Sequence, residues 1–468
     1  MAYAYQIIDK YRAEVKTTAP LHVGSADREE NEVLLHPVTD DPFLQASSIA
    51  GVLRTISETV NGADATKELF GSSYQKGDDT DRGSRVIISD GVMKLDTVKM
   101  EYRPRVKIDP RSGTVSSSKT GGSENDVGHK FGMELIGTGA EIEFFIYLFS
   151  TAEKSCKADL EKILAMLRTG GVQIGGQKTN GSGFLKLTSL KYHRFDMTTV
   201  EGRRDWAREE LMDTSFDKTG TIPKYEEKIK KLPNPGSSKT AYVVRLTGKT
   251  EGALLVKGIA AEGVGKDAPD AENMKNSAGK YIVPGSSLKG AVRSRMTYIA
   301  EYLQKKGIIE EIFGRTASTG DPGTSGSLIF KDIVLTDGTK TIRQHRIHLD
   351  KFTGGVMHGG LFSEKTVSGD INAEIIVKDG TYSDAATGLL LLALRDLAVG
   401  MINIGSGYNV GRGFITADKV SISAMQDGAE TKEAVISFAG SGDEGRDNIK
   451  DQDQVINSCL QALDKWRD

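Results

Sequence analysis

Cysteine, long apolar runs and surplus basic charge are all scarce in this chain of 468 residues. The two cysteines, Cys156 and Cys459, are too few for a cysteine-rich zinc site or a disulfide framework, so the sequence predicts a reducing compartment. No apolar run of about 18 residues occurs, and the N-terminal segment lacks a basic stretch followed by an apolar one. We therefore expect a cytoplasmic protein without a membrane partner. The formal net charge of −3 disfavours a free-standing nucleic-acid-binding protein but leaves room for a local basic groove.

Glycine, by contrast, is abundant, with 53 residues in the chain against an average usage of about 7%. No collagen-like period accounts for them, so we expect many in turns or where the backbone approaches a partner closely. The length predicts two or three domains rather than one.

The sequence contains two copies of one pattern. A serine pair, Ser47–Ser48 in the first copy and Ser286–Ser287 in the second, opens an amphipathic run in each. Each run ends in a Phe–Gly pair, and each copy closes with a glycine-rich loop. These loops align without a gap, at residues 174–184 and 404–414. Features shared in the same order indicate an internal duplication.

Both copies have the same expected order of elements: a strand, a long loop, the serine-headed helix, further strands, a second helix, the glycine loop and a last strand. This order predicts an α+β fold with two tandem ferredoxin-like domains. Within the linker between them, the charged run 222–232 is expected to be helical. The expected boundaries are 1–197 for the first domain, 198–240 for a helical linker, 241–422 for the second domain and 423–468 for a C-terminal extension with a helix.

The serine-headed helices are candidate anion sites. A helix N-terminus presents unpaired backbone N–H groups and about half a positive charge, and serine hydroxyls add donors. Lys289 and Arg293 are four residues apart, so they share one helix face and can meet successive phosphates of a bound strand. An ordinary cap with two solvated bases is the alternative. The candidate phosphate-binding residues here are Ser47, Ser48 and Arg54 in the first copy and Gly285, Ser286, Ser287, Lys289 and Arg293 in the second.

The glycine-rich loops are candidate backbone-binding loops. Their glycines permit close approach of a sugar-phosphate chain, Lys178 and Arg412 add charge, and Tyr408 offers a stacking face. The alternative is a glycine-rich turn before an edge strand. Dinucleotide binding is excluded, because it needs a strand before the loop and a helix after it, which is the reverse of the expected order.

The second copy resembles the RAMP superfamily in the segment Pro284–Gly290, in Arg293, in Phe313–Gly314 and in the terminal glycine loop. More narrowly, the chain is similar to the repeated backbone subunits of type III CRISPR RNA-guided effector complexes, and its two copies resemble the fused backbone subunits of type III-D-like systems. The resemblance implies an RRM-like (ferredoxin-like) palm in each half, a protruding thumb hairpin, and a groove for guide RNA. It also implies target RNA and neighbouring effector subunits, stacked along the guide, as partners.

The resemblance further implies a cutting aspartate in the loop between the first strand and the serine-headed helix. In the second copy the matching position is Asp270, with Asp267 as the alternative. In the first copy it falls on Leu35, which has no suitable chemistry, and Asp27 is a nearby carboxylate. Mg²⁺ or another divalent cation is implied by the family, with Asp270 as its ligand.

A basic excursion at 99–130 looks like the thumb of the first half, and a solvated loop is the alternative. Its counterpart in the second half contains three histidines near Asp350 at spacings that match no closed zinc template. The expected RNA contacts are Arg103, Arg105, Lys107 and Arg111 in the first excursion and Arg343, His345 and Arg346 in the second.

These patterns predict an RNA-binding backbone subunit that is also an endoribonuclease, cutting guide-paired target RNA in a metal-dependent reaction through Asp270. Two alternatives are a scaffold that orders guide RNA without cutting, and a metal-independent ribonuclease that processes guide RNA through histidine, tyrosine or lysine.

Overall fold

The computed structural model describes residues 5–24, 32–72, 83–109, 130–151, 154–209, 225–235, 240–258, 268–317, 322–336, 338–426, 429–438 and 448–467. Its elements, 28% helix and 41% strand, confirm the predicted mixed α+β class. None of the described helices is long and apolar enough to cross a membrane. The chain divides into two compact units: the first takes in residues 1–100, 135–178 and 182–238, and the second takes in 101–134, 179–181 and 239–468.

The first unit is built on one sheet whose central strand is β1. This strand pairs antiparallel with both β7 and β9, and the order across the sheet is β10-β9-β1-β7-β4-β2, with β3 on β7 and β8 on β9. The strands are β1 (Ile7–Thr17), β2 (Phe43–Leu44), β3 (Val86–Ile88), β4 (Gly91–Met93), β7 (Glu141–Ser150), β8 (Val172–Gln173), β9 (Phe184–Asp196) and β10 (Glu226–Glu227).

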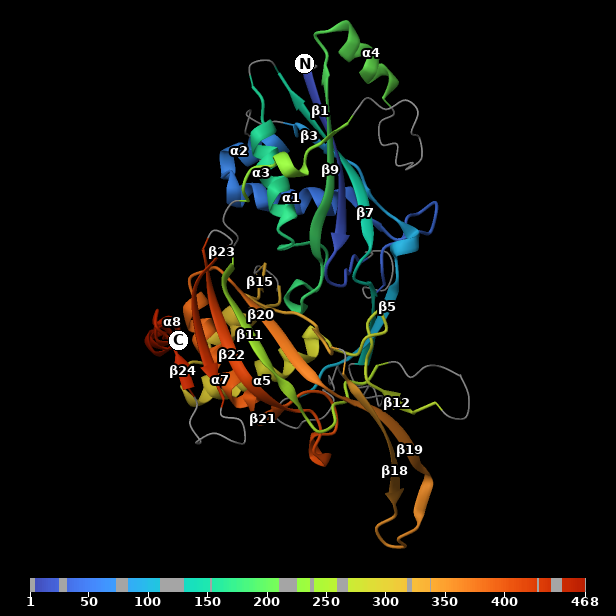
Figure 1. Ribbon diagram of the computed structural model, residues 1–468, viewed down its shortest axis with the longest axis vertical. Helices are drawn as coiled ribbons and strands as arrows, with labels where there is room; N and C mark the ends of the chain where they lie inside the picture. The colour runs from blue at the N-terminus through green and yellow to red at the C-terminus, as the bar shows by residue number, and fades with distance from the viewer. Residues whose placement is uncertain are drawn as a thin grey trace. The chain divides into compact units, whose positions relative to one another are not determined.

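Side chains that alternate along these strands give the first sheet two different faces. Tyr11, Ala13 and Val15 point to the main core. Three helices cover that face of the sheet (Figure 1), and they are α1 (Ala46–Val60), α2 (Ala63–Phe70) and α3 (Lys157–Arg168). On the other face, Phe145, Tyr147 and Phe195 form a small aromatic cluster with Trp206 of α4 (Val200–Arg208). The linker helix α4 therefore covers part of the face that the other helices leave open.

The second unit repeats this plan around β11. That strand pairs antiparallel with β20 and β22, and the order is β16-β20-β11-β22-β23-β24, with β21 on β22. Helices α5 and α7 cover one face, with Val244 and Leu246 of β11 in their shared core. The elements are β11 (Thr240–Glu251), α5 (Gly285–Tyr302), α6 (Ile308–Phe313), β16 (Leu328–Phe330), β20 (Asp370–Lys378), α7 (Ser383–Ala398), β21 (Val399–Asn403), β22 (Phe414–Gln426), β23 (Ala429–Ser437), β24 (Asn448–Lys450) and α8 (Val455–Lys465).

Four smaller sheets are separate from the two main ones. In one of them β18 and β19 form a long hairpin that extends away from the main sheet, and the short β12 pairs in parallel with β19 (Figure 1). The strands are β12 (Ala271–Glu272), β18 (Lys340–Leu349) and β19 (Val356–Ser368), then β13 (Ile282–Val283) with β17 (Ile333–Val334), β14 (Gly314–Arg315) with β15 (Thr324–Ser325), and β5 (Met100–Val106) with β6 (Lys130–Ile136).

The internal duplication is confirmed by backbone hydrogen bonds that recur in both halves. In the first glycine loop, Gly176 N donates to His22 O at 2.8 Å and Gly183 N donates to Pro20 O at 2.8 Å. In the second loop the same bonds run from Ser406 N to Leu255 O at 2.8 Å and from Gly413 N to Ala253 O at 2.9 Å. Each central strand also carries a register shift against the last strand of its copy.

Two sequence-based expectations about the connecting segments need correction. The charged run 222–232 is not helical where it is described, because residues 226–227 pair with β9 as β10 and Ile229–Lys231 form a single 3₁₀ turn. Sheet pairing overrides helix propensity there, and Pro233 ends the segment. The C-terminal extension has its predicted helix, α8, but also adds β23 and β24 to the sheet.

Candidate nucleic-acid interface

Helix α5 begins at Gly285 because Pro284 precedes it, and the side chain of Asp332 receives its first N–H group. The distance from Gly285 N to Asp332 Oδ1 is 2.8 Å. A side chain at position 285 has no room, since a Cβ there would lie 2.0 Å from Phe330 O. Ser286 and Ser287 are half-buried in the first turn. The serine-headed helix is therefore confirmed, and its N-terminus is capped by an acid distant in sequence.

A cluster of cations lies beside this first turn. Lys289 is half-buried and donates to Thr179 Oγ1 at 2.7 Å. Burial, together with the positive charges of Arg293, Arg105 and Lys378, lowers the pKa of Lys289 to about 8. Arg293 is exposed, and its guanidinium lies 5.2 Å from the ring centroid of Phe313. Cations that repel one another at a helix N-terminus make a strong site for an anion.

The basic residues predicted in the first excursion have different environments. Arg103 is only 4% exposed and pairs with Asp332 at 2.7 Å and with Glu101 at 2.7 Å, so its charge is neutralised within the protein. Burial, reinforced by the charge of Arg103, lowers the pKa of Arg105 to about 10. Lys107 is exposed, and Arg111 lies outside the described residues. Arg103 therefore forms ion pairs within the protein in place of the predicted phosphate contact.

The second glycine loop combines packed and open positions. A Cβ at Gly405 would lie 2.5 Å from Leu255 O and one at Gly413 would lie 2.1 Å from Ile404 O, so these two glycines serve the packing of the chain itself. Gly411, with a φ of +78°, has nothing within 4 Å of a Cβ. Tyr408 is 60% exposed and remains available for stacking. Arg412 is buried instead, held by a carboxylate of the hairpin.

The β18–β19 hairpin carries the other predicted contacts. Arg343 and His345 are exposed along β18, whereas Arg346 is half-buried, 3.3 Å from Glu364 Oε2. The guanidinium of Arg346 also lies 5.5 Å from the ring centroid of Phe362. The exposed bases therefore offer phosphate contacts, while Arg346 is already partly engaged.

Asp270 is exposed and lies at the start of β12, beside the middle of β19. Its backbone N–H donates to Ser363 O at 2.9 Å, and its Oδ2 accepts from Ser363 N at 2.6 Å. These two bonds fix the carboxylate on one side and leave Oδ1 for other partners. His345 is the register partner of Ser363 on β18, so a histidine and a carboxylate flank the same residue of the hairpin.

The structure corrects the match of the two halves in this loop. Leu35 forms an isolated bridge with Pro42, as Lys275 does with Tyr281, so Leu35 is the counterpart of Lys275 and not of Asp270. Upstream, Gly24 bridges Val33 as Lys257 bridges Asn273. Asp270 lies three residues before Asn273, and counting the same way from Val33 gives Glu30. Glu30, Asp27 and Asp267 all lie outside the described residues.

A divalent cation finds no preformed ligand set here. Among the residues that the structure describes, no group of three or more His, Cys, Asp or Glu side chains is arranged to hold a metal ion. The nearest acid to Asp270 on β19 is Glu364, which three cations already neutralise. The described residues around Asp270 therefore do not by themselves make a protein-built metal site.

Comparison with known families gives one match. The sequence profile described as the RAMP superfamily matches residues 14–186 and 261–416, one region in each half. The chain belongs to the RAMP superfamily. This membership supports a CRISPR-associated, RNA-binding subunit. A comparison with curated proteins finds no match.

The first RAMP repeat has a sparser version of the interface. Ser47 is exposed and Ser48 is half-buried at the start of α1, and Ala46 N donates to Asp90 Oδ1 at 2.7 Å. Arg54 is 3.8 Å from Glu58, one turn later. Burial lowers the pKa of Lys178. Ala50 stands where the second repeat has Lys289, so this helix has fewer cations for a phosphate.

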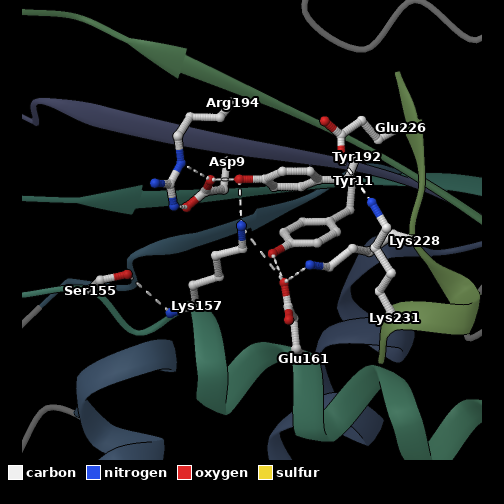
Figure 2. Close-up of polar contacts among 10 residues, drawn as sticks. All are labelled: Asp9, Tyr11, Ser155, Lys157, Glu161, Tyr192, Arg194, Glu226, Lys228 and Lys231. Carbon is white, nitrogen blue, oxygen red and sulfur yellow. Dashed lines mark hydrogen bonds and ion pairs between the residues drawn. The ribbon is translucent and has the colours of Figure 1, made fainter. Parts of the chain in front are cut away.

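The first RAMP repeat also contains a buried polar cluster between its sheet and α3. Asp9 accepts hydrogen bonds from Tyr192 at 2.5 Å and from Arg194 at 2.8 Å, and Lys157 donates one to the Tyr192 hydroxyl at 2.6 Å. These contacts are drawn in Figure 2. Burial and the bond to Asp9 raise the pKa of Tyr192 above its ordinary value. A buried, protonated phenol is a poor base and does not meet RNA, so this cluster does not support the guide-processing alternative.

Sequence reasoning missed the residues that hold the RAMP site together. Asp332 caps α5 and neutralises Arg103, Ser363 fixes Asp270, and Glu364 neutralises Arg412. None belongs to a local motif, and each partner is distant in the chain. A carboxylate in an ordinary strand or turn carries no sequence signal of such a contact.

Proposed function

We propose that this RAMP protein is a double-length backbone subunit of a type III-D-like CRISPR effector complex, in which each half forms a palm that holds guide RNA. Target RNA pairs with the guide, and the second half cuts it through Asp270. Other effector subunits stack beside the chain along the guide. The repeated topology and the two family matches support the double-length arrangement.

One observation carries the proposal: a single compact unit contains both a cation cluster at a helix N-terminus and an exposed loop carboxylate. Lys289 and Arg293 have no carboxylate partner among the described residues, so their charges are available to a phosphate. Burial of Lys289 costs free energy that a bound anion recovers. Arg343 and Lys107 add two exposed basic side chains to the same unit.

The chemistry needs little beyond positioning, because RNA supplies its own nucleophile. In the proposed step, the 2′-oxygen attacks the adjacent phosphorus while Asp270 Oδ1 accepts its proton, and the bond from phosphorus to the 5′-oxygen breaks. The leaving 5′-oxygen takes a proton. The proposed donor is the exposed His345, which is paired in register with Ser363, the residue that binds Asp270. The products are a 2′,3′-cyclic phosphate and a 5′-hydroxyl.

Dependence on Mg²⁺ or another divalent cation stays a prediction. Because the described residues provide no three-ligand site, no step above runs through a metal ion. Cutting that survives EDTA supports carboxylate catalysis without a cation, and cutting lost in EDTA and restored by Mg²⁺ supports a cation held by RNA phosphates and water with Asp270.

The test uses the chain assembled with a guide RNA and an end-labelled complementary RNA. We expect Asp270→Asn to retain guide and target binding but to lose the cut made by the second half. Asp370→Asn, an exposed acid on β20 of the same unit, is the matched control and should cut normally. Unchanged cutting by Asp270→Asn removes the catalytic assignment, and failure of the wild-type chain to retain RNA removes the function.

A further inference from the structure

Two residues of β19, Ser363 and Lys365, hold the strand that begins beside Asp270. Ser363 N donates to Asp270 Oδ2 at 2.6 Å, and Lys365 Nζ lies 3.1 Å from Glu272 Oε1 on β12. Between them, Glu364 is buried and points to the opposite face of the hairpin. Since β12 has only two residues, the position of Asp270 depends on where β19 lies.

Glu364 is itself fixed by an arginine from the glycine loop. Arg412 Nη1 lies 2.6 Å from Glu364 Oε2, and both side chains are 6% exposed. Arg412 also donates through Nη2 to Gln344 on β18. One guanidinium therefore joins the loop to both strands of the hairpin through two nitrogens, a planar bridging geometry that lysine cannot reproduce.

We propose that Arg412 is a positioning residue for Asp270: by holding Glu364 and Gln344 it fixes the hairpin so that the Ser363 N–H meets the Asp270 carboxylate. The inference rests on the proposed function for its catalytic consequence, but its structural part is independent. It replaces the phosphate contact expected of Arg412 from the sequence.

The other ion pairs at this hairpin are less suited to the task. Glu272 is held by three donors, Lys275, Tyr281 and Lys365, so the loss of one leaves two. Arg412 provides the shortest ion pair of Glu364, against 3.3 Å from Arg346 and 3.6 Å from Lys257. Removing it leaves a buried carboxylate with weaker partners, which is costly and moves the strand.

The same contact links two functions of the unit. Arg412 follows Tyr408 and Gly411, whose exposure suits them to lie against guide RNA. A displacement of this loop by the guide is transmitted through one side chain to β19 and on to Asp270. Binding of the guide at the glycine loop and the position of the Asp270 carboxylate are therefore linked through Arg412.

The experiment compares Arg412→Gln and Arg412→Lys in the guide-bound chain. We expect guide binding to be retained, and single-turnover cutting of complementary RNA to fall about tenfold or more in Arg412→Gln, because small displacements of a catalytic group are costly. Arg412→Lys should be intermediate. Hydrogen exchange of the Ser363 amide should accelerate in both. Arg245→Gln, which removes a half-exposed ion pair with Glu374 on the main sheet, is the matched control.

Two backgrounds separate positioning from a general loss of structure. The residual single-turnover rate of Asp270→Asn at the second-half site should fall no further when Arg412→Gln is added, since both changes act through one carboxylate. Should Arg412→Gln fail to fold, the double variant Glu364→Gln/Arg412→Gln removes both buried charges and still lacks the link.

The inference is overturned if Ser363 exchange is unchanged in these variants, or if Arg412→Gln lowers cutting equally in both backgrounds. If Asp270→Asn cuts normally while Ser363 exchange still responds to Arg412→Gln, the catalytic function fails and the positioning role stands.

Discussion

Asp90 and Asp332 do the same thing in the two halves of the chain. Each accepts the first backbone N–H of its serine-headed helix, from Ala46 at 2.7 Å and from Gly285 at 2.8 Å. They differ in one respect, because Asp332 also binds the buried guanidinium of Arg103 at 2.7 Å.

This difference predicts unequal costs for the same substitution. Asp90→Ala removes a helix-capping acceptor and should lower the free energy of unfolding by about 1 kcal/mol. Asp332→Ala also leaves Arg103 buried with one acid fewer, and should cost about 3–5 kcal/mol. Urea unfolding of both variants is the measurement. Equal losses contradict the structural role given to Arg103.

The lowered pKa of Lys289 predicts a pH dependence of RNA binding. The ammonium is charged below a pKa of about 8 and neutral above it, and a bound phosphate favours the charged form. Affinity for guide RNA should therefore be higher at pH 7 than at pH 9. Lys289→Arg keeps its charge throughout, so its affinity should change less across this range in filter binding at fixed salt. A wild-type profile as flat as that of Lys289→Arg excludes Lys289 from the phosphate site.

The glycine loop predicts that two neighbouring glycines respond differently to alanine. Gly411 and Gly413 have φ values of +78° and +79°, so either substitution strains the backbone by about 1–2 kcal/mol. Only at Gly413 does the new Cβ also collide with the chain, 2.1 Å from Ile404 O. Thermal unfolding should rank Gly413→Ala well below Gly411→Ala. The reverse order is incompatible with the loop described above.

In the first unit, the cluster in Figure 2 predicts that Asp9 is structural. Asp9→Ala leaves the buried Tyr192 hydroxyl without its acceptor and the half-exposed Arg194 without its ion pair, and should lower the free energy of unfolding by about 1–3 kcal/mol. Glu226, in the exposed pair with Lys231 of the same figure, is the control and should cost less than about 1 kcal/mol as alanine. A small effect at Asp9 means that the cluster is not a stabilising one.

The number of cuts in target RNA tests the first half. If Glu30 takes the role of Asp270 there, Asp270→Ala removes one cut and Asp270→Ala/Glu30→Gln removes both. Asp27→Asn tests the alternative carboxylate of the same loop. Two cuts in the wild type, with one sensitive to Asp27→Asn and not to Glu30→Gln, favour the sequence-based candidate instead. A single cut in the wild type leaves the first half as a binding palm.

Local patterns in the sequence predicted much of the fold. Strand alternation, the serine-headed helices, the glycine loops and helix α3 at Lys157–Arg168 lie where propensity and periodicity place them. The duplication was also readable, because both copies keep the same motifs in one order. The exposed candidates Arg293 and Tyr408 were found from such motifs, whereas Asp270 was found from the family resemblance.

Tertiary structure decided which basic side chains are exposed to a ligand and which are neutralised by ion pairs within the protein. Arg103 and Arg412 look in sequence like Lys289 and Arg293, yet both are buried against acids far along the chain. The bridges in the structure showed that Leu35 corresponds to Lys275 and not to Asp270. The structure also showed that β23 and β24 extend the second sheet. The sequence determined the elements because their signals lie within a turn or a strand. Only the folded chain settled the role of each charge, because burial and ion pairing depend on residues that the sequence keeps apart.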